Sequence, residues 1–76
     1  MDTDNLIRMA NRIGEFFSAM PDHAEALDGI AGHIQRFWEP RMRRALLSHL
    51  ESTGGEGLSP IVLEAVRRHQ ASLTPA

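Results

Sequence analysis

The histidines of this chain are candidate metal ligands and its serines are candidate nucleophiles, but neither set has the spacing that such a site requires. The chain has four histidines, His23, His33, His49 and His69. None of them belongs to a Glu-x-x-His or His-x-x-x-His motif, which would bring two ligands to one helix face. The serines have no neighbouring base or oxyanion motif. Cysteine is absent, which excludes disulfides, thiolate catalysis and cysteine-held zinc or iron–sulfur sites. We therefore expect no catalytic, cofactor-binding or metal site in this chain.

Binding chemistry is concentrated instead in the segment Arg36-Phe37-Trp38-Glu39-Pro40-Arg41-Met42-Arg43-Arg44. This segment holds the only tryptophan and four of the eight basic residues. Tryptophan and arginine are enriched at the centres of protein interfaces, because each offers a large flat area with polar hydrogens at one edge. Leu47 follows closely and falls outside the apolar stripe of its helix. We expect a partner-binding surface formed by Arg36, Trp38, Arg41, Arg43, Arg44 and Leu47.

Trp38 has a second interpretation, since a tryptophan at a helix end is also a common core residue. It lies either at the edge of the expected surface or behind it, supporting it from within. The all-arginine character of the basic residues has two explanations as well. Codon bias in a GC-rich genome is one, and a need for bidentate ion pairs at a protein contact is the other.

The overall charge argues against nucleic acid as a partner. The formal net charge is −2 and the isoelectric point is near 6.0, so the chain lacks a basic surface able to neutralise many phosphates. The N-terminal residues are acidic and polar, unlike a signal peptide, and no apolar run approaches the roughly 20 residues of a membrane span. We expect a cytoplasmic protein that contacts neither nucleic acid nor a membrane.

The fold class follows from helical periodicity between clear breaks. A chain of 76 residues forms one domain, 1–76, and we expect an all-α, small single-domain bundle of three to four helices. Prolines 21, 40 and 60, together with the Asp22 to Glu25 capping pattern, separate the helices. The expected helices span about 4–20, 22–38, 40–52 and 59–73, and the glycine-rich segment 53–58 is expected to be a flexible loop.

The apolar stripes predict the core. We expect one buried cluster formed by Ile13, Phe17, Leu27, Ile30, Ile34, Leu46 and Val66, and we place Phe37 on the buried stripe of the second helix. Two glycines, Gly29 and Gly32, lie inside that helix, where each costs about 1 kcal/mol relative to alanine. One explanation is that these glycines leave the outer side of the helix without side chains, so that another backbone can approach closely. The other is that packing within the fold overrides their low helix propensity.

The histidines are expected to have structural roles. His49 and His69 fall on apolar stripes, which favours a core-edge position with one ring nitrogen bonded to a carbonyl oxygen. His23 and His33 are expected to face solvent.

Several motifs together resemble a known family. The first is Ile7-Arg8-Met9-Ala10-Asn11 with Phe16-Phe17, and the second is Phe37-Trp38-Glu39-Pro40-Arg41-Met42 followed by Leu46-Leu47. The third is Gly54-Gly55-Glu56-Gly57-Leu58-Ser59-Pro60. From about Asn5 to Val66, the chain resembles the small delta subunit of NAD-dependent, molybdenum-containing formate dehydrogenases.

The resemblance implies a complex whose larger subunits are the partners of this chain. Those subunits would hold the molybdenum bis-guanine-dinucleotide cofactor, iron–sulfur clusters and FMN, and would pass electrons from formate to NAD⁺. The family assigns no cofactor or catalytic residue to the delta subunit. We therefore expect a non-catalytic accessory subunit that stabilises the assembly or its cofactor-loaded form. The alternatives are a transient maturation factor for insertion of the molybdenum cofactor and a small helix-turn-helix protein that binds nucleic acid.

Overall fold

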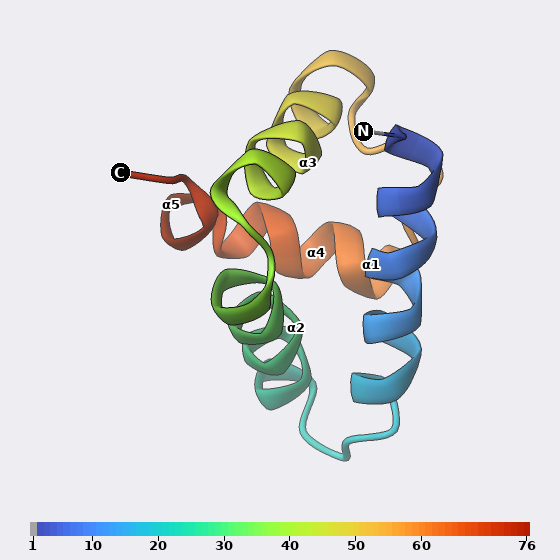
Figure 1. Ribbon diagram of the computed structural model, residues 1–76. Helices are drawn as coiled ribbons and strands as arrows, with labels where there is room; N and C mark the ends of the chain where they lie inside the picture. The colour runs from blue at the N-terminus through green and yellow to red at the C-terminus, as the bar shows by residue number, and fades with distance from the viewer. Residues whose placement is uncertain (1) are drawn as a thin grey trace.

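The computed structural model describes residues 2–76, and within that range it contains helices and no strand. The elements are α1 (Thr3–Phe17), α2 (His23–Phe37), α3 (Pro40–Thr53), α4 (Pro60–Arg68) and α5 (Gln70–Leu73) (Figure 1). The all-α prediction is confirmed. Residues 2–76 form five helices. This is one more than the upper limit expected, because the helix predicted over 59–73 is divided into α4 and α5.

The helix starts follow from local chemistry. Asp2 caps α1, its carboxylate accepting a hydrogen bond from the Asp4 amide at 3.0 Å, and Asp22 caps α2 by accepting from the Glu25 amide at 3.1 Å. Proline occupies the first turn of both α3 and α4, where a missing amide hydrogen is not needed. The helices therefore begin where the sequence predicts.

Two helix ends differ from the prediction. α1 ends at Phe17 and not near residue 20, because the chain already turns there, with the Met20 amide bonded to the Phe17 carbonyl at 3.0 Å. The helix expected over 59–73 breaks at His69, whose backbone leaves the helical region with φ −108° and ψ 24°. The break turns α5 so that Leu73 is fully buried against the core.

The core forms where α4 crosses the molecule and packs against α1, α2 and α5 (Figure 1). The buried face of α4 consists of Val62, Ala65 and Val66, all with no exposed surface. Five of the seven predicted core residues are fully or almost fully buried: Leu27, Ile30, Ile34, Leu46 and Val66. Ile13 and Phe17 are partly buried and pack against this cluster.

A glycine that the periodicity did not single out sets the distance between α1 and α4. Gly14 is buried, and a Cβ atom added there would lie 2.5 Å from Cγ2 of Val62. Any side chain at this position would therefore push α4 away from α1. The close packing of these two helices depends on the bare backbone at Gly14.

The glycine-rich connection between α3 and α4 is hydrogen-bonded to side chains of α1 and α3. Asn11 on α1 reaches across to it, donating from its side-chain amide to the Gly57 carbonyl at 3.0 Å and accepting from the Ser59 amide at 2.9 Å. Thr53 Oγ1 accepts from the Gly55 and Glu56 amides. Three glycines in the segment have φ values of 76° to 90°, which glycine adopts without strain. The loop expected to be flexible thus has a defined set of anchors.

Replacing Asn11 by Ala tests this anchoring. The variant loses both hydrogen bonds and leaves the Gly57 carbonyl and the Ser59 amide without their partner, so its free energy of unfolding should fall by about 1–3 kcal/mol. Urea denaturation followed by circular dichroism measures the loss. Asn5→Ala, on the exposed side of the same helix, is the matched control and should change stability by less than about 0.5 kcal/mol. Equal stabilities for the two variants would show that the loop is not held through Asn11.

Candidate protein-docking surface

The arginines of the segment 36–44 are not equivalent in the structure. Arg36 lies in the last turn of α2, and Arg41 and Arg44 lie one turn apart near the start of α3; all three are exposed. We call these three residues the basic corner. They are the sequence-predicted site residues that the fold leaves accessible.

Arg43 and Leu47 are half-buried. Arg43 points to the end of α5, where a guanidinium nitrogen donates to the Leu73 carbonyl at 3.4 Å, and its Nε atom is buried without a partner. Leu47 packs against the hydrophobic core. Both residues therefore have a structural contact of their own and offer less surface to a partner than Arg41 and Arg44 do.

Trp38 is buried, with 5% of its surface exposed. It caps the C-terminal end of α2 and belongs to the same core cluster as Leu46 and Leu50. Of its two interpretations, the structure supports the core residue. The indole belongs to the core and is not available as a docking anchor.

Two arginines of the basic corner, Arg41 and Arg44, lie where the dipole of α3 disfavours positive charge. The N-terminus of a helix carries a partial positive charge, so arginines in the first turns of α3 raise the potential there instead of lowering it. Among residues 2–76, the only basic side chains with a carboxylate oxygen within 4.0 Å are His23, next to Glu64, and His69, next to Asp28. No described arginine has such a partner. The corner is left as an unneutralised positive region.

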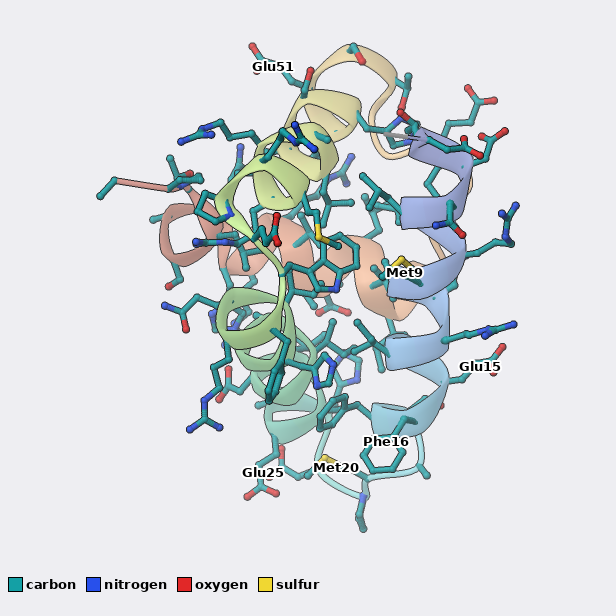
Figure 2. All side chains as sticks on the ribbon, viewed as in Figure 1. Met9, Glu15, Phe16, Met20, Glu25 and Glu51 are labelled. Carbon is teal, nitrogen blue, oxygen red and sulfur yellow. The ribbon has the colours of Figure 1, made fainter. Side chains whose placement is uncertain are left out.

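A second exposed feature is a row of aromatic rings that crosses from α1 to α2. Centroid distances are 5.1 Å from Phe16 to Phe17, 6.4 Å from Phe17 to His33 and 4.8 Å from His33 to Phe37. We call these four side chains the ring row. Phe16 is 74% exposed and Phe37 69% exposed, the only large apolar side chains so exposed in the part of the chain described. Figure 2 shows Phe16 and Met20 at the same end of the molecule.

The placement of Phe37 on the buried stripe is wrong. Counting 100° per residue, Phe37 lies about 60° from Ile34, at the edge of the apolar stripe and on the side of His33. At the last residue of α2 its ring stacks against His33 and remains largely in solvent. Phe16 was missed altogether. The signal for it was the adjacent pair Phe16-Phe17. Neighbouring residues on a helix point about 100° apart, so when Phe17 lies on the apolar stripe of α1, the ring of Phe16 points away from the centre of that stripe.

Gly29 and Gly32 lie beside the ring row, and they differ. A Cβ atom at Gly29 would overlap the Phe17 ring, so this glycine lets the ring lie on the backbone of α2. A Cβ atom at Gly32 would meet nothing within 4 Å. One glycine is therefore required by packing inside the chain, whereas the other bares the outside of the helix.

The surface is hollowed on both sides of the ring row. One hollow, of about 340 Å³, is lined by His33 of α2 and by four residues of α1: Arg12, Ile13, Phe16 and Phe17. The other, of about 410 Å³, shares Phe17 and His33 with the first and is completed by Asp28, Gly29, Gly32, Arg36 and Phe37. Together the two hollows form a shallow groove between α1 and α2, which we call the α1–α2 groove.

The histidines divide between confirmed and revised predictions. His49 is partly buried and its Nε2 lies 2.6 Å from the Glu56 carbonyl oxygen, as expected. His69 contacts a carboxylate, Asp28 Oδ1 at 2.8 Å, and not a carbonyl. His23 is exposed and lies 2.8 Å from Glu64, whereas His33 is half-buried in the ring row. Each histidine therefore has a partner within the fold, and residues 2–76 contain no group of three or more potential metal ligands.

The family of the chain follows from a match that spans most of its length. Residues 5–66 match the family described as NADH-dependent formate dehydrogenase delta subunit, FdsD. The chain belongs to this family. No curated protein and no solved structure matches it. None of the helices of the delta subunit within residues 2–76 is long and apolar enough to cross a membrane.

The neighbouring residues Trp38 and Phe37 provide a matched test of which ring is core and which is surface. Trp38→Ala in the delta subunit should lower the free energy of unfolding by about 3–5 kcal/mol, because it removes a buried indole. Phe37→Ala removes an exposed ring and should change stability by less than about 1 kcal/mol. Thermal or urea unfolding measures both. Similar losses in the two variants would contradict the assignment.

The two glycines of α2 provide a second matched pair. Gly32→Ala should raise the free energy of unfolding by about 0.5–1 kcal/mol, because alanine favours the helix and its methyl group meets open space. Gly29→Ala gains the same propensity but displaces the Phe17 ring, so it should be the less stable of the two by about 1 kcal/mol or more. Chemical denaturation of the two variants decides the order, and the reverse order would show that Phe17 does not rest on Gly29.

Proposed function

We propose that this delta subunit is a non-catalytic accessory subunit that docks on the larger subunits of a cytoplasmic NAD-dependent formate dehydrogenase. There it stabilises the assembly or its cofactor-loaded form. On this proposal the molybdenum cofactor, the iron–sulfur clusters and FMN belong to the larger subunits, and the present chain contributes contacts alone.

The observation that carries the proposal is the basic corner. Arg36, Arg41 and Arg44 are exposed and have no carboxylate within 4.0 Å among residues 2–76, and two of them lie where the α3 dipole already makes the electrostatic potential positive. Near the start of α3, the charges of Arg41 and Arg44 do not stabilise the free subunit. The basic corner favours an acidic patch on another protein, since arginine pairs bidentately with carboxylates and complementary charge accelerates association.

Family membership supports the other formate dehydrogenase subunits as the partners. The matched family is that of a subunit of formate dehydrogenase, so the proteins that this surface would contact are the other subunits of that enzyme. The formal net charge of −2 disfavours the alternative of a nucleic-acid-binding protein, because a protein of this kind needs many phosphate contacts.

Co-expression with the larger subunits tests the accessory role. The delta subunit should co-purify with the mature, cofactor-loaded enzyme in a constant ratio to the other subunits. A complex purified without it should lose cofactor or dissociate at a lower temperature. Presence of the subunit only in cofactor-free precursors would instead identify a maturation factor, and failure to bind either form would overturn both assignments.

Substitution of the basic corner tests the surface. Arg41→Ala together with Arg44→Ala should leave the subunit as stable as before or more stable by a few tenths of a kcal/mol, because two charges opposed by the helix dipole are removed. The same variant should bind the larger subunits at least about tenfold more weakly, with the difference shrinking as salt is raised.

Arg43→Ala is the matched control for this prediction. It removes the contact to the Leu73 carbonyl and a half-buried stem, so it should lower the free energy of unfolding by about 1 kcal/mol. Binding should be weakened less than in the double variant. Wild-type affinity of the Arg41 and Arg44 variant at low salt would show that the basic corner is only a solvated surface.

A further inference from the structure

We infer that the α1–α2 groove binds an amphipathic, acidic helix from one of the larger subunits. Its apolar side chains would lie along the ring row, and its carboxylates would pair with Arg12 and Arg36. This inference rests on the proposed function and adds the chemistry of the partner segment.

The apolar part of the argument is the exposure of the ring row. Phe16 and Phe37 are the two most exposed large apolar side chains of residues 2–76, and they stand at opposite ends of one continuous row. Aromatic rings in a hollow are typical anchors of protein interfaces, because burying each ring removes a large apolar area from water. The hollow on the Phe16 side is lined almost entirely by carbon, apart from Arg12 and His33.

The geometry favours a helix as the occupant. Successive rings in the row are 4.8–6.4 Å apart, close to the rise of about 6 Å between residues i and i+4 of an α-helix. The walls of the groove are two helices, so they offer side-chain pockets and no open strand edge for an extended peptide. Gly32 has open space above its backbone, which allows the partner helix to approach α2 closely.

The charges of the groove favour carboxylates on that helix. Arg12 lines the hollow on the Phe16 side and Arg36 lines the hollow on the Phe37 side, and neither has a carboxylate within 4.0 Å among the described residues. The one acidic side chain of the lining, Asp28, is already in contact with His69. His33, the remaining titratable group, lies in the middle of the row. A second copy of this chain would bring two further arginines and no carboxylate other than Asp28 from its own groove, so a partner helix with free carboxylates fits the groove better.

Photo-crosslinking in the co-expressed complex identifies the occupant. A photoreactive phenylalanine analogue replaces Phe37 in one variant and Phe16 in another, both at exposed positions where the fold tolerates change. Each should crosslink to the same segment of one larger subunit, and that segment should read as a helix with apolar residues at i, i+3, i+4 and i+7 flanked by Asp or Glu. The analogue at Glu51, which Figure 2 shows at the far end of the molecule from Phe16, is the control and should not label this segment.

Charge reversal tests the ion pairs. Arg12→Glu together with Arg36→Glu should weaken binding to the larger subunits by at least about tenfold, and changing the crosslinked carboxylates to Arg should restore it. Arg8→Glu together with Arg68→Glu makes the same change in net charge outside the groove and should weaken binding less. Circular dichroism confirms that both double variants remain helical.

The outcomes separate the inference from the proposed function. Failure of the wild-type subunit to co-purify with the larger subunits overturns the proposed function itself. Normal co-purification, with equal binding of the two charge-reversed variants, overturns the inference alone. Crosslinks from Phe37 to a second copy of the chain, to nucleic acid or to a segment without the apolar and acidic pattern also overturn the inference.

Discussion

The packing of α4 against α1 and α2 is the constraint on which the rest of the structure depends. Val62, Ala65 and Val66 of α4 are fully buried, and Leu27, Ile30 and Ile34 of α2 share the same core. Gly14 permits α1 to approach α4 closely enough to close this core. A chain of 76 residues can bury only a small core, and these residues of α2 and α4 form part of it. The aromatic rings at the ends of α1 and α2 lie beyond it.

That arrangement separates the parts of the chain that stabilise the fold from the parts that do not. Trp38 and Leu47, which the sequence places next to the arginines, belong to the core or pack against it, and Arg43 bonds to α5. Arg36, Arg41 and Arg44 are exposed and have no carboxylate partner in the described part of the chain, and Phe16 and Phe37 are exposed as well. Charges opposed by a helix dipole and exposed rings weaken a free subunit or make it prone to association. Burial against a partner would relieve both effects.

Much of the fold was predictable because the residues that start its helices act locally in the sequence. Asp22, Pro40 and Pro60 determine where helices begin, and periodicity identified five fully buried core residues together with the partly buried Ile13 and Phe17. The break at His69 was not predictable in this way, because it depends on Leu73 reaching the core and on a contact with Asp28 of α2. Phe37 was misplaced for a related reason. A residue at the edge of an apolar stripe is buried only if another element covers it, and periodicity does not show which elements do.

The candidate surface was predictable in composition but not in extent. The run of arginines predicted a binding surface around the end of α2 and the start of α3, but only Arg36, Arg41 and Arg44 of that run are exposed, whereas Arg43 is half-buried against α5. The ring row escaped prediction because it joins residues from two helices, and only the tertiary structure brings Phe17 beside His33. Gly29 and Gly32 were noticed from their cost in a helix, and the structure assigns them different roles.

The central claim is that the exposed rings of this subunit become buried on the formate dehydrogenase complex. Hydroxyl-radical footprinting of the wild-type subunit, free and in the complex, measures this most directly because it reports solvent access to individual side chains. Phe16 and Phe37 should be oxidised in the free subunit and strongly protected in the complex, whereas the buried Trp38 should be unreactive in both. Equal oxidation of the two phenylalanines in the free and assembled states would contradict the account.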